Sequence, residues 1–205
     1  MTVDLNLLTK KPLMIVISGP SGVGKDSLIH ELLKRNLPIH FVITANTRVP
    51  RPDEKEGVDY FFVSHERFQE MIKQDELIEY SRVYEDYKGV PKSQVKQAFS
   101  SGKDVIMRLD VQGAEKIRKL FPEALLIFLV PANEEEWLER FRGRNGELPA
   151  DWEVRMKKVK EELQKVPLFD YIVVNPKNKL EEAAAVVEAI LTAEHHRSCP
   201  RSTTL

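Results

Sequence analysis

Short continuous apolar runs, separated by segments with helical spacing of apolar residues, recur along most of the chain. The runs cover residues 13–17, 39–44, 104–109, 124–130 and 171–174. Such runs are typical of strands buried on both faces of a sheet. Alternation of strands and helices predicts an α/β fold with a parallel sheet and helices on both faces.

The segment 44–90 departs from this alternation. It carries turn residues at Pro50, Pro52 and Gly57, a short strand at 60–63 and a helix that begins after Ser64. We interpret it as a lobe inserted into the main domain.

The remaining pattern sets the expected boundaries. Asn133 and Glu136 have the spacing of a capping box before a helix. Residues 143–149 lack apolar periodicity and are expected to form part of a lid at about 142–155, before helices at 151–165 and 180–193. One domain is expected at 12–193, with its core at 12–43 and 91–193. The polar tail 194–205 is expected to be disordered.

Composition excludes several classes of protein. Lys plus Arg number 31 against 32 Asp plus Glu, a net charge of -1, which argues against general nucleic-acid binding. The apolar runs fall far short of the roughly 20 residues of a membrane helix, so no membrane association is expected. The single Cys199 allows no internal disulfide. The start lacks a leader-like pattern, which favours the cytoplasm.

A glycine-rich motif follows the first predicted strand. The segment 19–25, Gly-Pro-Ser-Gly-Val-Gly-Lys, fits the phosphate-binding loop of nucleotide-binding proteins, between a strand and a helix as that motif requires. Its backbone N–H groups and the helix N-terminus can hold phosphate oxygens, while Lys25 adds a positive charge. The candidate nucleotide-binding residues here are Gly19, Pro20, Ser21, Gly22, Val23, Gly24, Lys25, Asp26 and Ser27.

Asp26 departs from that motif, because Ser or Thr normally stands there and offers a hydroxyl to Mg²⁺. A carboxylate can bind Mg²⁺ directly or through a water molecule. It can equally serve only to stabilise the N-terminus of the helix. Ser27 follows one residue too late to fill the usual position.

The inserted lobe carries a second anion-binding pattern. Residues 44–51 read Thr-Ala-Asn-Thr-Arg-Val-Pro-Arg, and residues 57–63 read Gly-Val-Asp-Tyr-Phe-Phe-Val. In these residues, and along 12–193 as a whole, the chain resembles guanylate kinase. The resemblance implies that the phosphate of GMP is bound by Thr44, Arg48, Arg51 and Tyr60. Two guanidinium groups three residues apart suit a phosphate well.

The resemblance also implies a guanine site. Glu79 matches a carboxylate that reads the N1–H and N2 amino donors of guanine. Asp110 matches a second carboxylate near the base and the metal, so the tentative Mg²⁺ ligands are Asp26 and Asp110. Where many family members have Tyr-Gly-Ser, this chain has Lys88-Gly89-Val90 after Tyr87, and we keep Tyr87 as a candidate GMP contact.

One further departure is Arg108, which replaces the first Asp of the commoner Asp-x-Asp-x-Gln-Gly pattern. Since Asp26 adds a carboxylate and Arg108 adds a guanidinium, the two substitutions are expected to form a charge pair.

The resemblance implies lid arginines at Arg144 and Arg155, which approach the transferred phosphoryl group together with Lys25 and Arg48. These four are the expected catalytic residues. Asn175 matches a family residue beside the adenine of ATP, although Asn before Pro is also ordinary turn chemistry.

The expected activity is phosphoryl transfer from ATP to GMP with Mg²⁺, by a monomer or weak homodimer. Two alternatives stay open: a noncatalytic guanylate-kinase-like module that binds proteins, and a monophosphate kinase for another base. Glu79 distinguishes the last of these.

Overall fold

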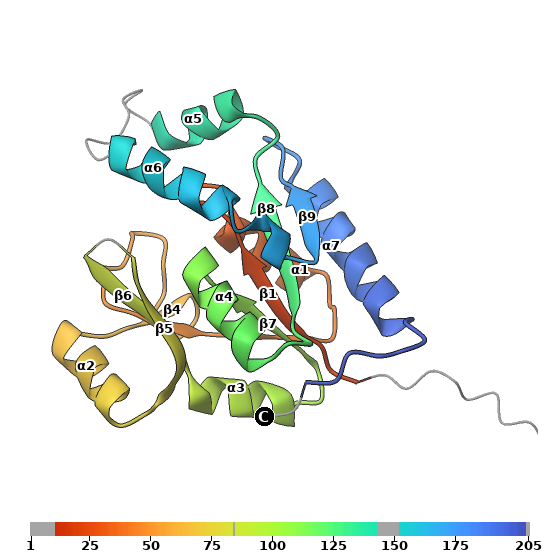
Figure 1. Cartoon of the computed structure of the whole chain (residues 1–205), viewed down its shortest axis with the longest axis horizontal. Coiled ribbons are helices and arrows are strands. Elements are labelled where there is room, and N and C mark those ends of the chain that lie inside the picture. The colour runs from red at the N-terminus through yellow and green to blue at the C-terminus, as the bar shows by residue number, and fades with distance from the viewer. Residues whose placement is uncertain (1–10, 84, 143–151, 204–205) are drawn as a thin grey trace, which may run out of the picture.

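A five-stranded parallel sheet forms the centre of the molecule (Figure 1). The computed structural model describes residues 11–83, 85–142 and 152–203. The strands stand in the order β2-β7-β1-β8-β9, so the first and third predicted runs are neighbours. Their bounds are β1 Met14–Ser18, β2 Ile39–Val42, β7 Asp104–Arg108, β8 Leu125–Val130 and β9 Tyr171–Val174.

Successive residues of β1 enter two different hydrophobic clusters, because side chains alternate between the faces of a strand. Ile15 and Ile17 pack under α1 and α7, whereas Met14 and Val16 pack under α3 and α4. Helices therefore cover both faces, as the sequence predicts, while α5 and α6 lie over the end of the sheet (Figure 1). The helices are α1 Lys25–Lys34, α2 His65–Lys73, α3 Lys92–Ser100, α4 Val111–Leu120, α5 Glu134–Arg142, α6 Trp152–Leu163, the 3₁₀ helix η1 Val166–Leu168 and α7 Leu180–His195.

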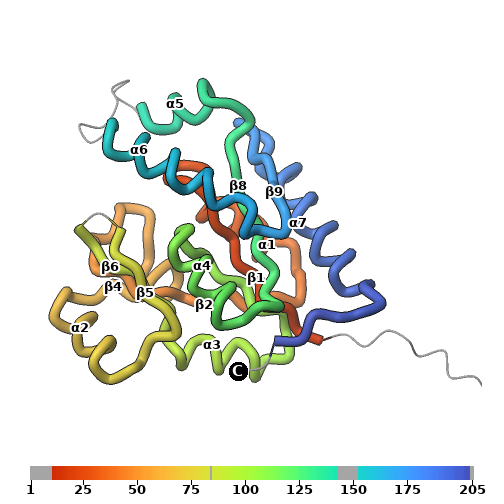
Figure 2. Tube along the Cα trace, in the orientation of Figure 1, coloured from red at the N-terminus to blue at the C-terminus, as the bar shows by residue number. Residues whose placement is uncertain are grey.

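A smaller sheet, in the order β4-β3-β6-β5, forms the inserted lobe with α2. Figure 2 follows the chain from β2 into this lobe and back through α3. The expected strand 39–44 is in fact divided: β2 ends at Val42, and the chain enters the smaller sheet at Thr44. The strands of this sheet are β3 Thr44–Asn46, β4 Tyr60–Phe62, β5 Leu77–Val83 and β6 Asp86–Pro91.

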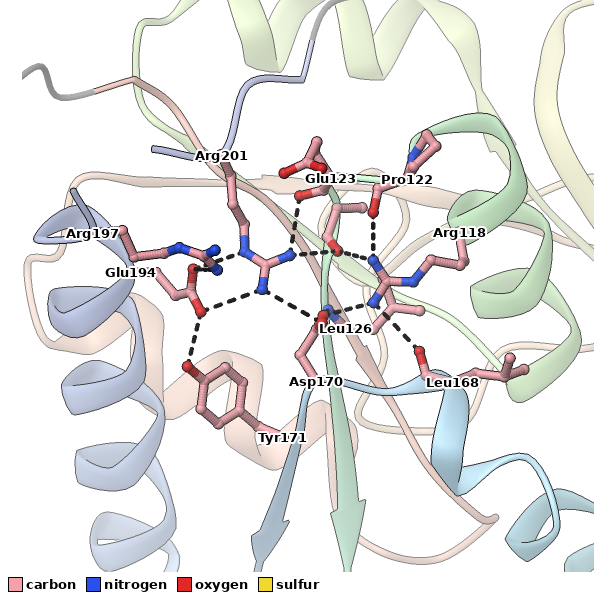
Figure 3. A network of polar contacts seen from close by, with 11 residues as sticks. Arg118, Pro122, Glu123, Leu126, Leu168, Asp170, Tyr171, Glu194, Arg197 and Arg201 are labelled. Atoms are coloured by element: carbon pink, nitrogen blue, oxygen red, sulfur yellow. Dashed lines mark hydrogen bonds and ion pairs between the residues drawn. The ribbon is translucent and has the colours of Figure 1, made fainter. Parts of the chain in front are cut away.

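Residues 195–203 correct the expectation of a disordered tail. α7 continues to His195, and Arg201 is buried (Figure 3). Arg201 donates a hydrogen bond of 2.7 Å from Nε to Glu194 and lies 3.4 Å from Asp170. The tail buries charge rather than apolar surface, which is why its composition indicated disorder.

Other expectations are met closely. Asn133 Oδ1 accepts a hydrogen bond of 2.9 Å from the backbone of Glu136, as a helix cap does. The excursion at 143–149 and most of the expected lid lie outside the described residues. Among the described helices, none has the length and apolar character needed to cross a membrane.

Candidate active site

A pocket of about 480 Å³ lies between the phosphate loop, the smaller sheet, the end of β7 and helices α5 and α6. The sequence-predicted residues that line it are Gly19, Ser21, Gly22, Gly24, Lys25, Asp26, Ser27, Thr44, Arg48, Arg51, Tyr60, Glu79, Asp110 and Arg155. Lys88 and Arg108, the two departures noted in the sequence, line it as well, and the lining residues that the sequence did not single out include Ser81, Arg140, Phe141, Lys158 and Glu162. Residues far apart in the chain thus share one pocket.

The phosphate loop has a backbone that only glycine allows. Gly19 has a φ of 139°, and a Cβ there would lie 2.2 Å from the carbonyl oxygen of Leu129. Gly24 has a φ of 91° and directly precedes α1. Lys25 Nζ folds back onto the loop and donates to the carbonyl oxygens of Gly19 and Pro20, at 2.5 Å and 2.9 Å. Burial lowers the pKa of Lys25, so an incoming phosphate gains a poorly hydrated cation.

Helix α5 supports this loop from outside. Trp137 Nε1 donates to the carbonyl oxygen of Ser21 at 2.9 Å, and Arg140 donates to that of Val23 at 3.0 Å. Asn175 Nδ2 also donates to Val23 O, at 2.8 Å, and Asn175 is buried. The adenine contact of Asn175 therefore stays a prediction, since its side chain here holds the loop.

Arg140 was missed by the sequence reasoning, although its position carried a usable pattern. Trp137 and Phe141 are the apolar residues of α5 that face the loop, and Arg140 lies three residues after Trp137 on the same helix face. Its guanidinium also donates to the carbonyl oxygen of Asn175 at 2.6 Å. Arg140 thereby joins α5 to both the loop and the end of β9.

The acceptor side of the pocket carries the two expected arginines around one carboxylate. Arg48 donates to both oxygens of Glu54, with a distance of 2.7 Å from Nη1 to Oε2. The backbone N–H of Arg51 donates to the same Oε2 at 2.8 Å, and the Arg51 side chain is exposed. Tyr60 and Thr44 are buried beside them. Two guanidinium groups, a phenol and a hydroxyl therefore line this side of the pocket, and charge-assisted hydrogen bonds from guanidinium groups suit a phosphate.

Glu79, on β5, lies at the far end of the acceptor lobe. It is 4% exposed, and within the described chain its Oε2 has no hydrogen-bond partner. Burial, with the nearby negative charge of Asp110, raises the pKa of Glu79 to about 8. A Cβ on Gly113 would lie 3.1 Å from both carboxyl oxygens, so glycine leaves room for them. An unpaired buried carboxyl group of this kind suits a ligand with two adjacent donors.

Asp110 caps α4 and belongs to the same end of the pocket. Its Oδ1 accepts from the backbone of Gly113 at 2.8 Å, and its Oδ2 accepts from the Ser81 hydroxyl at 2.6 Å. Ser81 stands two residues after Glu79, so both face the pocket from β5. The sequence reasoning missed Ser81 because the strand pattern alone gives it no distinguishing chemistry.

Tyr87 is not brought to the pocket. Its ring stacks on Phe68 with centroids 5.4 Å apart, inside the small hydrophobic cluster of the inserted lobe. The next residue of β6, Lys88, lines the pocket instead, because neighbouring strand residues point to opposite faces. Tyr87 as a GMP contact therefore stays a prediction, and Lys88 is its neighbour on β6 that lines this pocket.

The expected charge pair between Asp26 and Arg108 is confirmed. Arg108 Nη1 donates to Asp26 Oδ1, and Arg108 Nη2 donates to the backbone oxygen of Asp59 at 2.6 Å. The guanidinium carbon lies 4.0 Å from the centre of the Tyr60 ring. Arg108 thus connects the helix after the phosphate loop with the acceptor lobe.

The carboxylates fit magnesium only in a limited way. No cluster of three potential metal-binding side chains occurs among the described residues. Magnesium usually takes one or two protein carboxylates together with phosphate oxygens and water. Asp26, with a side chain 41% exposed, fits that role, whereas both oxygens of Asp110 already accept hydrogen bonds. The residues thus fit a magnesium ion held mostly by nucleotide phosphates.

Helix α6 closes the pocket from above with charged side chains. Arg155 lines it together with Lys158 and Glu162. Burial raises the pKa of Glu162, while the charge of Lys25 acts in the opposite direction. Arg144, the other expected lid arginine, lies outside the described residues.

A phosphate loop faced by a second anion site on an inserted lobe defines the class of P-loop phosphotransferases. The guanylate kinase family model matches residues 11–194, and the chain belongs to the guanylate kinase family. Guanylate kinase 2, chloroplastic/mitochondrial, of rice is 44% identical over 185 residues, which are 90% of this chain and 65% of the rice protein.

Two further relatives match over nearly their full length. The guanylate kinase of Clostridioides difficile is 37% identical over 191 residues, covering 93% of this chain and 92% of that protein. The crystal structure of guanylate kinase from Anaplasma phagocytophilum has a TM-score of 0.75 and 28% identity, covering 96% of this chain and 93% of that one. The shared fold includes the inserted lobe.

Proposed function

We propose that this chain transfers the γ-phosphoryl group of ATP to GMP and so makes ADP and GDP. The observation that carries the proposal is the arrangement of one pocket: a phosphate loop on one side, Arg48 and Arg51 on the other, and the buried Glu79 at the far end. Relatives that are named guanylate kinases support it.

The pocket residues suggest how transfer proceeds. The transition state of phosphoryl transfer is loose and spreads negative charge over the phosphoryl oxygens, so catalysis depends on positioning and positive charge. Lys25 leaves the loop carbonyls to hold the donor phosphates, and Arg48 holds the acceptor phosphate. Arg155 and Arg144 are proposed to approach from the lid and to exclude water.

Mg²⁺ is proposed as the cofactor and would neutralise charge on the donor phosphates. Asp26 would hold it, directly or through water. Asp110 is kept as a second candidate, with a water molecule as the intermediary because its oxygens are occupied.

Guanine is proposed to be selected by Glu79. The guanine edge carries two adjacent donors that a carboxylate can accept, whereas adenine would leave the carboxylate unpaired. Initial rates with GMP, AMP, UMP and dTMP at equal concentration, in an assay coupled to ADP formation, test this. Faster turnover of GMP by about 10³-fold or more is expected. Equal rates with AMP would rule out the guanine assignment.

A noncatalytic protein-binding module is the alternative. Lys25 and the arginines of the pocket favour an enzyme, because a binding module needs no phosphate loop with this chemistry. A chain that binds GMP but forms no ADP above the background of a Lys25→Ala variant would favour the module instead.

For location and assembly, we propose the cytoplasm and a monomer or weak homodimer. The rice relative, named as chloroplastic and mitochondrial, supports an organelle as the alternative location.

A further inference from the structure

Lys88 occupies a central place in the pocket that nothing in the proposed reaction yet uses. On β6 it pairs in register with Ser81 of β5 and with Asn46 of β3. Cross-strand neighbours point to the same face of a sheet, so the Lys88 side chain lies on the same face as Ser81 and Asn46, between them. Its amino group lies 5.9 Å from the centre of the Tyr60 ring, on the acceptor phosphate side.

The charges around Lys88 come from both nucleotide sites. Burial lowers the pKa of Lys88 to about 8, and the positive charges of Lys25 and Arg108 act in the same direction. The negative charges of Asp110 and Asp26 partly oppose them. The charge of Lys25 on the phosphate loop therefore acts on Lys88, which also lies beside Tyr60 of the acceptor lobe.

Lys88 differs from Arg48 and Arg108 in its ion-pair partners. Arg48 pairs with Glu54, and Arg108 pairs with Asp26. Within the described part of the chain, no carboxylate forms an ion pair with the Lys88 amino group. A half-buried ammonium group without an anion, in a pocket with other cations, gains most from an anionic ligand.

We propose that the Lys88 ammonium group binds the phosphoryl group while it is transferred from ATP to GMP. This inference rests on the proposed function and deepens it. Lys88 lines the same pocket as Lys25 of the phosphate loop and Arg48 of the acceptor lobe. An ammonium group between the two phosphate sites stabilises the negative charge of the donor and acceptor phosphates. It does so most strongly in the transition state.

The main test compares Lys88→Met and Lys88→Arg with the wild type, and uses Lys92→Met as the matched control. Lys92 follows on the same stretch of chain, but its side chain pairs with Asp75 and does not line the pocket. Lys88→Met is expected to lower kcat for GMP by about 10²-fold, the cost of losing one transition-state donor. Lys88→Arg should recover most of that loss, and Lys92→Met should match the wild type.

Calorimetry separates a phosphate contact from a base contact. Lys88→Met should weaken GMP binding by less than about tenfold and leave guanosine binding unchanged. Equal weakening of guanosine and GMP would mean that Lys88 binds the base, and that result would overturn the proposal. A kcat within twofold of the wild type would overturn it as well.

The pH profile adds a measurement that a structural role would not move. Lys88 loses its charge as the pH rises through about 8, so kcat/KM for GMP should fall on the alkaline side. Lys88→Arg should remove that fall, because arginine stays charged. If Lys88→Met does not fold, Lys88→Arg decides: an unchanged alkaline limb contradicts the inference.

The proposed function can fail separately. A wild-type protein that phosphorylates no GMP would refute the function itself, whereas loss of activity in Lys25→Ala but not in Lys88→Met would refute only the role of Lys88.

Discussion

Two buried glutamates in this molecule have pKa values shifted in opposite directions. At the C-terminal end, Glu194 accepts from Arg201, Tyr171 and Arg197, and it is almost fully buried (Figure 3). Burial alone would raise the pKa of Glu194, but these hydrogen bonds outweigh it and hold that pKa below its usual value. In the pocket, Glu79 is as deeply buried, and its pKa is raised to about 8.

The difference lies in what completes each group. Glu194 finds its hydrogen-bond donors within the fold, so its charge serves stability. Glu79 lies where a ligand can supply the missing donors, and Lys88 lies where a ligand can supply an anion. Substitutions in the two regions should accordingly change different measured quantities.

The largest expected effect comes from Lys25→Ala. Loss of this cation should lower kcat for GMP by about 10³-fold, because the donor phosphates lose a direct positive contact. The free energy of unfolding should change by less than about 1 kcal/mol, since among the described residues the Lys25 amino group donates only to loop carbonyls. Steady-state kinetics and urea unfolding measure both quantities. Lys34→Ala, at the exposed end of the same helix, is the control.

Arg201→Ala should show the reverse behaviour. It leaves the buried Glu194 short of its main donor, and breaking such a pair costs about 3 kcal/mol. Urea unfolding should show this loss, while KM for GMP stays within twofold of the wild type. Arg197→Ala, whose side chain is 44% exposed, should cost less than about 1 kcal/mol. Similar losses in both variants would contradict the distinction between buried and exposed partners.

The pair of Asp26 and Arg108 lies between these extremes. Asp26→Ser leaves the buried Arg108 without its carboxylate, and Arg108→Asp places two carboxylates together. Each single variant should lose about 2 kcal/mol of stability, and the double variant should lose less than their sum. The double variant should also keep a higher kcat/KM than either single one. Strict additivity in unfolding and in kinetics would show that the two residues act independently.

The smallest expected effect is a pH dependence of GMP affinity. With a pKa of about 8 in the free protein, Glu79 is mostly protonated at pH 7, and guanine requires the carboxylate. GMP affinity should therefore fall about tenfold per pH unit between pH 7.5 and 6.5. Calorimetry with Glu79→Gln corrects for the titration of GMP itself, and an equally steep fall in that variant would assign the effect elsewhere.

The same raised pKa affects stability. Glu79 favours the folded state most at pH values below its ordinary pKa, and this contribution is lost as the pH rises through about 8.

The parallel sheet, the phosphate loop and one charge pair could be predicted from the sequence. The apolar runs predict the parallel sheet because each strand is covered on both faces. The phosphate loop was predictable because its motif lies between a strand and a helix. Opposite charges at two substituted positions predicted that Asp26 and Arg108 would meet, and they do.

Features that depend on strand parity or on distant partners could not be predicted. A register shift of one residue in β6 would turn Tyr87 toward the pocket and Lys88 away from it. No periodic pattern in the sequence fixed that register. Arg201 lies in a polar segment, and its partner Asp170 is 31 residues earlier, directly before β9. Ser81 gains its importance only from the nearby Asp110.

The contact between Arg48 and Glu54 has a consequence for how substrate enters. With both carboxylate oxygens on this guanidinium, the charge of Arg48 is matched by Glu54, while the exposed Arg51 side chain keeps its own positive charge. A phosphate that approaches Arg48 therefore competes with Glu54 for the same N–H donors. A small anion without a guanine base makes no contact with Glu79, so it gains little from competing with Glu54. The ion pair between Arg48 and Glu54 therefore disfavours such anions relative to GMP.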